Sequence, residues 1–95
     1  MEKSVRVEVD VIAQFNRDGQ IIPLRVRITG EDGEPHAYTI RSYTDLSHKG
    51  VFTTPDGIYV TNDILVYECC IVVFEAKKII HLYYDMSESS WTMTV

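Results

Sequence analysis

The first half of the chain alternates apolar and polar side chains with a period of two, and this alternation constrains the fold most. It runs through residues 3–15, 21–29 and 36–43, which are separated by glycine-containing turns. From Val5 to Phe15 every odd position is apolar, while most positions between them are charged or polar. Side chains of a β-strand point alternately to the two faces of a sheet, so the pattern indicates half-buried strands. The short turns predict that neighbouring strands pair antiparallel.

The second half of the chain adds three strands. These are predicted at residues 65–75, 79–85 and 90–95, with a lysine-containing turn at 76–78 between the first two. A chain of 95 residues has room for one core, so we expect a single β domain over residues 1–95. With about six strands and short turns, the prediction is an all-β antiparallel meander that forms a small barrel or a sharply curled sheet. Residues 44–64 show no period and are expected to form a long loop or irregular segment, which could include a helical turn or a short strand at 57–60.

Single residues add detail to this prediction. Gly19 ends an Asn-Arg-Asp-Gly turn and is expected to have a positive φ. Pro23 cannot donate a backbone hydrogen bond, so it belongs at an edge, at a bulge or at the start of a strand. Trp91 lies on the same strand face as Met93 and Val95, and we expect this face to be in the core.

The spacing of turn and core residues resembles that of a group of small uncharacterised bacterial all-β proteins. The matching residues are Ala13-x-Phe15-x-x-x-Gly19-x-Ile21-x-Pro23-Leu24, Tyr38-x-Ile40, and the final strands at 80–85 and 91–95. The resemblance covers most of the chain outside residues 44–64. It implies the fold and a bacterial origin, and it implies no activity, because its motifs consist of core and turn residues.

Composition and charge narrow the class of protein. The chain is 45% hydrophobic and 24% charged, which is typical of a soluble globular domain. Residues 1–4 lead directly into the first strand, and the longest apolar run, 69–74, is too short to cross a bilayer. We therefore expect no signal peptide and no membrane association. Cys69 and Cys70 are adjacent on a strand and point to opposite faces, so we expect free thiols and a cytoplasmic location.

No motif predicts catalysis or a cofactor. The potential metal ligands are His36, His48, His81, Cys69 and Cys70, and none of their spacings places two ligands on one metal ion. The chain has no Gly-x-Ser-x-Gly motif and no glycine-rich loop that opens a helix. Cys70 and His81 could meet across neighbouring strands, but a buried thiol and a surface imidazole are the more frequent outcome. The sequence predicts a non-enzymatic protein without metal or cofactor.

An arginine-containing sheet face supports one functional hypothesis, the binding of single-stranded nucleic acid. This face would present Arg25, Arg27, Arg41 and Tyr43. Arginines and aromatic rings on an exposed sheet are used to bind phosphates and to stack on bases. If Phe15 faces Gln20 across the first turn, however, Glu8 pairs with Arg27 and Asp10 with Arg25, which neutralises two arginines. The net charge of −5 also argues against nucleic acid as a partner.

An apolar outer face on the later strands supports the main hypothesis, a small binding or protein-interaction module that uses this face or the 44–64 loop. The outer positions of residues 65–75 and 79–85 include Val72, Phe74, Ile79 and Tyr83. Contiguous exposed apolar side chains usually mark interaction sites. Two covers are available for them. Residues 44–64 could fold back with Val51, Phe52, Ile58 and Tyr59, or a second chain could cover the face, as a homodimer or as another protein partner.

Overall fold

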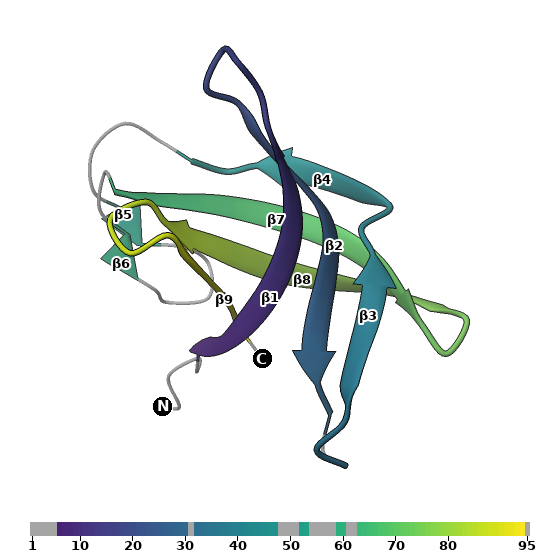
Figure 1. Cartoon of the computed structure of the whole chain (residues 1–95). Helices are drawn as coiled ribbons and strands as arrows, with labels where there is room; N and C mark the ends of the chain where they lie inside the picture. Colours follow the sequence, from purple (N-terminus) through teal and green to yellow (C-terminus); the bar gives the residue numbers. More distant parts are fainter. Residues whose placement is uncertain (1–5, 31, 48–51, 54–58, 61–62, 95) are drawn as a thin grey trace.

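The computed structural model describes residues 6–30, 32–47, 52–53, 59–60 and 63–94, and all regular structure within these ranges is β-strand (Figure 1). The strands are β1 (Arg6–Phe15), β2 (Ile21–Thr29), β3 (Pro35–Thr39), β4 (Ser42–Asp45), β5 (Phe52–Thr53), β6 (Tyr59–Val60), β7 (Ile64–Val73), β8 (Ala76–Asp85) and β9 (Ser90–Thr94). The all-β class is therefore confirmed. Residues 3–5 and Val95, which were predicted at the ends of strands, lie outside the described residues.

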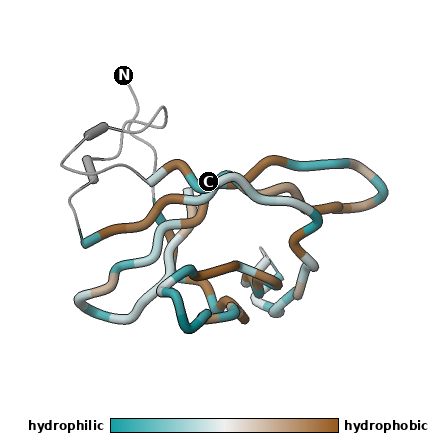
Figure 2. Tube along the Cα trace, turned by 90° about the horizontal axis from the view of Figure 1, so that it is seen from above, coloured by the Kyte–Doolittle hydropathy of each residue, from teal (hydrophilic) through white to brown (hydrophobic). Residues whose placement is uncertain are grey.

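Seven strands form one curled sheet in the order β3-β2-β1-β9-β8-β7-β4, and each neighbouring pair is antiparallel. The curl begins at β1, which pairs through Arg6–Val9 with β9 and through Asp10–Phe15 with β2. Because the two halves of β1 pair with different neighbours, the sheet bends around the core and forms a half-barrel (Figure 2). The meander prediction is confirmed in this curled form.

The predicted strand 36–43 is divided into two strands at opposite edges of the sheet. The N–H of Ile40 donates to the carbonyl of Leu24 on β2 (2.9 Å), whereas the N–H of Arg41 donates to the carbonyl of Cys70 on β7 (2.8 Å). The chain thus changes its partner strand between two consecutive residues. This change brings the two sheet edges, β3 and β4, together at one corner. It also shifts the alternation by one residue, since Tyr38 and Ile40 pack against the core before the corner and Tyr43 packs against it after the corner.

The first hairpin closes one residue later than predicted. Phe15 pairs with Ile21, because Gln20 stays in the turn and its carbonyl accepts a hydrogen bond from the N–H of Asn16 (2.8 Å). Gly19 has a φ of 91°, which confirms the predicted left-handed conformation.

A β-bulge then shifts the register of β2 against β1. The pairing skips Leu24, next to the buried Pro23, so the bulge position predicted for this proline is confirmed. The expected ion pairs Glu8–Arg27 and Asp10–Arg25 are consequently wrong, and the observed partners are Asp10 with Arg27 and Ile12 with Arg25.

Replacing Gly19 with valine is expected to lower the free energy of unfolding by about 1 kcal/mol or more, because β-branched residues disfavour positive φ. No atom lies within 4 Å of the position of the added Cβ, so the cost comes from the backbone alone. Urea unfolding measures the change. Gly19→Asn is the matched control and should lose less, since asparagine tolerates this conformation. An equal midpoint for wild type and valine variant would contradict the prediction.

The hairpin between β7 and β8 has a shorter turn than predicted. Val73 pairs with Ala76, which leaves only Phe74 and Glu75 in the turn, so the predicted turn at 76–78 is wrong. Phe74 has a φ of 50° and Glu75 a φ of 67°. A two-residue turn with positive φ at both positions is of type I′, for which asparagine and glycine are the usual residues. Neither residue is present here, so the sequence carries no signal for this turn.

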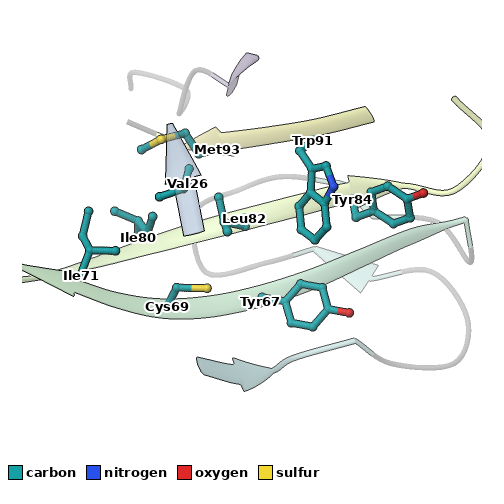
Figure 3. Packing of buried hydrophobic residues seen from close by; sticks show 9 residues of the cluster. All are labelled: Val26, Tyr67, Cys69, Ile71, Ile80, Leu82, Tyr84, Trp91 and Met93. Atoms are coloured by element: carbon teal, nitrogen blue, oxygen red, sulfur yellow. The ribbon is translucent and has the colours of Figure 1, made fainter. Parts of the chain in front are cut away.

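The core lies on the inner face of the curled sheet (Figure 3). Its buried members are Val26, Tyr67, Cys69, Ile71, Ile80, Leu82, Tyr84, Trp91 and Met93. The inward positions predicted for Trp91 and Met93 are confirmed, with exposed fractions of 8% and 4%. Three aromatic rings, those of Tyr67, Tyr84 and Trp91, lie at one end of the cluster, and Ile71 lies at the other (Figure 3).

Within residues 44–64, β5 and β6 pair with each other and form a separate two-stranded sheet. Of the four residues proposed to cover the later strands, Val51 and Ile58 lie outside the described residues. The described ranges contain no helix that is long and apolar enough to span a membrane.

Candidate interaction surface

The four residues that the sequence nominated as an interface lie on the outer face of the β7–β8 hairpin, except for Phe74, which lies in its turn. Cross-strand partners along this face, from the open end of the hairpin to the turn, are Val66–Tyr83, Glu68–His81, Cys70–Ile79 and Val72–Lys77. The structure divides the face into a covered part at Tyr83 and an exposed part near the turn.

Tyr83 belongs to the covered part. It is 1% exposed and forms a second small core with Val66, against which Leu46 and Ile64 pack. Ser47 stabilises the packing of the neighbouring Leu46 over this core, because the Oγ of Ser47 accepts a hydrogen bond from the N–H of Val66 (2.9 Å). Residues from the 44–64 segment therefore cover Tyr83, and its assignment to an exposed interface does not agree with the structure.

A polar pair separates the two parts of the face. The Nε2 of His81 lies 3.2 Å from the Oε2 of Glu68, directly across the strands. Cys70 is opposite Ile79, so the structure places the His81 ring against a carboxylate and not directly opposite the thiol.

The exposed part consists of Val72, Phe74 and Ile79, which we call the hairpin patch. Their exposed fractions are 36%, 97% and 56%. Phe74 combines near-complete exposure with a left-handed backbone, which costs on the order of 1–3 kcal/mol for a non-glycine residue. Such costs are typical of functional sites, where the conformation presents a side chain. The hairpin patch is therefore the strongest candidate surface among the described residues.

Two lysines lie near the hairpin patch, Lys77 on the same face of the hairpin as Val72 and Lys78 on the opposite face, with the core residue Ile71. Both lysine side chains are exposed, and the only acidic residue in the turn is Glu75. Since the whole chain has a net charge of −5, this end of the hairpin is a local exception that favours acidic partners.

The two cysteines differ in environment although they are neighbours. Cys69 is fully buried in the core, and burial raises the pKa of its thiol from 9.0 to about 12, with a smaller contribution from Glu68. Cys70 is half-buried on the outer face, opposite Ile79 of the hairpin patch. Both are free thiols.

A thiol reagent at about pH 8 is expected to modify only Cys70 in the native protein, because a buried protonated thiol does not react. Ellman's reagent should count one thiol in the native state and two in urea. Cys70→Ser is the control and should show no reactive thiol until it is unfolded.

The free energy of unfolding should also fall as the pH rises from 9.0 towards 12, because the Cys69 thiol of the unfolded chain ionises in this range while that of the folded protein stays protonated. Rapid native modification of Cys69 would contradict its placement.

The arginine face nominated for nucleic acid is not continuous. Arg27 is engaged by Asp10, with its Nε 3.0 Å from the Oδ2. Tyr43 faces inward, where its ring contacts Tyr67 edge-on at a centroid distance of 6.1 Å. Arg25 is exposed on β2, and Arg41 is exposed at the corner between β3 and β4. The structure thus separates the aromatic residue from the arginines.

Sequence reasoning missed a chain of aromatic contacts across the inside of the half-barrel. The successive ring pairs are Phe15–Tyr84 (6.0 Å), Tyr84–Trp91 (4.7 Å), Trp91–Tyr67 (6.0 Å) and Tyr67–Tyr43 (6.1 Å). Burial raises the pKa of Tyr67 to about 12, with a further contribution from Asp45. Their inward strand positions were a signal, but only the register shows that the rings meet. We assign this cluster to the core.

Within the described residues, no group of three or more histidine, cysteine, aspartate or glutamate side chains could hold a metal ion. His48, one of the nominated ligands, lies outside those residues. Comparison with known proteins found no matching family model, curated protein or solved structure. The resemblance to small bacterial all-β proteins therefore stays a prediction.

Proposed function

We propose that this protein is a small non-enzymatic interaction module that binds a protein through the hairpin patch. The supporting observation is Phe74, which is 97% exposed at the tip of the β7–β8 hairpin in a left-handed conformation. Burying a phenylalanine side chain contributes about 1.5–3 kcal/mol. An exposed, conformationally costly phenylalanine is a poor choice for stability alone, so a contact that buries it provides the reason for its presence.

The hairpin also presents this side chain at a low entropic cost. Each strand has ten residues, and the pairing continues up to the turn, so the patch sits on an ordered element. Binding through ordered elements loses little conformational freedom, which favours affinity for a given contact area. The two free thiols support a reducing compartment, and we propose a bacterial cytoplasm as the location.

The first binding partner to test is a second copy. In the double variant Val72→Thr/Phe74→Lys, the fold should stay intact, because both side chains are exposed. We expect wild type to increase in mass with concentration in light scattering and the double variant to remain monomeric. Unfolding of the double variant would show that the patch belongs to the core, and would contradict the proposal.

A photo-crosslinking amino acid at position 74 tests for other protein partners in the expressing cell. Position 15 is the matched control, because Phe15 is also exposed (60%) but contacts Tyr84 of the core. We expect a discrete covalent product at position 74 and not at position 15. The proposal fails if wild type is monomeric and the two positions give the same products.

Titration with a labelled oligonucleotide at low salt tests the alternative function, nucleic-acid binding by Arg25 and Arg41. We expect no saturable signal in this titration.

A further inference from the structure

We propose that the free edge of β3 receives an extended segment of the partner, which adds to the sheet as a strand and alternates apolar with acidic residues. This inference rests on the proposed function and names the kind of segment that the module binds. Strand addition at a sheet edge is a common mode of peptide recognition, in which backbone hydrogen bonds provide affinity and alternate side chains provide specificity.

The backbone of β3 has hydrogen-bonding groups available at this edge. Among the described residues, β3 is the last strand of the sheet, and its one strand partner is β2 on its other side. The N–H of Ile40 donates to Leu24, and the carbonyl of Glu34 accepts from Gly30, so the even-numbered residues of this strand bond to β2. Because bonding alternates along an antiparallel strand, Ala37 and the next odd-numbered residue, Thr39, direct their N–H and carbonyl groups away from β2.

A notch beside this edge is large enough for an extended segment. An open depression of about 770 Å³ lies between β3 and the β7–β8 turn, and its lining residues are Arg25, Gly30, Asp32, Pro35, His36, Ala37, Tyr38, Val73 and Phe74. The carboxylate of Asp32 in this lining is paired with His36, whose Nε2 lies 3.4 Å from its Oδ2. β3 meets β7 near the corner with β4 and diverges from the hairpin towards its own first residue (Figure 1). A segment bonded to β3 would therefore contact Phe74 with its other side, which connects the notch to the hairpin patch.

The walls of the notch define the chemistry of the segment. Tyr38 and Val73, both half-buried, form the inner wall and favour apolar side chains. On the outer side Arg25 reaches the cavity beside the small Ala37. Arg25 is exposed and makes no ion pair with another described residue. Alternate positions of the segment should therefore be apolar towards the core and acidic towards Arg25.

A single segment fits this site better than the edge of a second folded copy. The β7–β8 turn bounds the notch on the side opposite β3. If β3 of a second copy paired with this edge, β2 of that copy would lie on the far side of the added strand. This β2 would then collide with the β7–β8 turn. The notch therefore favours one unaccompanied extended strand.

The test is an NMR titration of the full chain with a nine-residue peptide in which valine alternates with aspartate. We expect saturable shifts and slowed amide exchange at Ala37 and Thr39. Two N-methylated versions provide the decisive comparison, because methylation of alternate residues blocks only one edge of the peptide. One version should lose binding and the other should retain it. A peptide with lysine for aspartate should bind at least about tenfold more weakly, and Arg25→Glu should reverse this preference.

The absence of shifts at Ala37 and Thr39 at millimolar peptide would overturn the inference, as would an equal effect of the two methylated versions. These results are separable from those that test the proposed function. Crosslinking at position 74 or concentration-dependent mass without any peptide response at β3 would leave the hairpin patch as an interface and remove strand addition. If crosslinking, light scattering and the peptide titration were all negative, both the hairpin-patch interface and strand addition would be rejected.

Discussion

Replacing Trp91 with alanine is expected to lower the free energy of unfolding by about 3–5 kcal/mol. Trp91 is 8% exposed, and its ring lies 4.7 Å from that of Tyr84 and 6.0 Å from that of Tyr67. Truncation would leave a cavity in the middle of the aromatic cluster. Small domains have total stabilities of about 5–15 kcal/mol, so the variant should be largely unfolded at moderate urea concentrations. Urea unfolding followed by circular dichroism measures the loss.

Phe15→Ala is the matched control for this prediction. Phe15 belongs to the same chain of aromatic contacts, through Tyr84, but is 60% exposed. Its truncation removes less buried area and should cost about 1 kcal/mol or less. Equal losses for the two variants, or a native tryptophan emission spectrum identical to that of the unfolded chain, would contradict the placement of Trp91 in the core.

Replacing Phe74-Glu75 with asparagine and glycine is expected to raise the free energy of unfolding by about 1–3 kcal/mol. Both residues have positive φ, and these two substitutes adopt the type I′ turn without the cost that a phenylalanine or a glutamate incurs. The same variant lacks the aromatic ring of the hairpin patch. We therefore expect it to be more stable than wild type and to lose self-association. Thermal unfolding and light scattering measure the two effects.

Glu75→Gly alone separates stability from binding. It removes the free-energy cost of the positive φ at position 75, because glycine adopts this conformation readily, and it leaves Phe74 in place. This variant should gain part of the stability and retain the association of wild type. If the double replacement left stability unchanged, the left-handed conformation would carry no cost, and the argument from Phe74 to an interface would lose its basis.

Much of the interface prediction followed from strand alternation. Val72 and Ile79 occupy outer positions that β1 gives to charged residues, and both are exposed in the structure. Tyr83 has the same signal in the sequence but is buried, because Leu46 and Ile64 pack over it. Alternation assigns a residue to a face of its own sheet, and it contains no information about segments that cover that face.

Local sequence by itself determined the all-β class, the antiparallel order of the hairpins, the positive φ of Gly19 and the inward position of Trp91. Each depends on residues that are near in sequence, whose side-chain period or backbone preference is a local property. Only the tertiary structure decided the change of partner at Ile40 and Arg41, the bulge register that joins Asp10 to Arg27, and the left-handed turn at Phe74. These depend on hydrogen bonds and packing between distant strands, whose combined free energy exceeds the local preferences and leaves no sign in the sequence pattern.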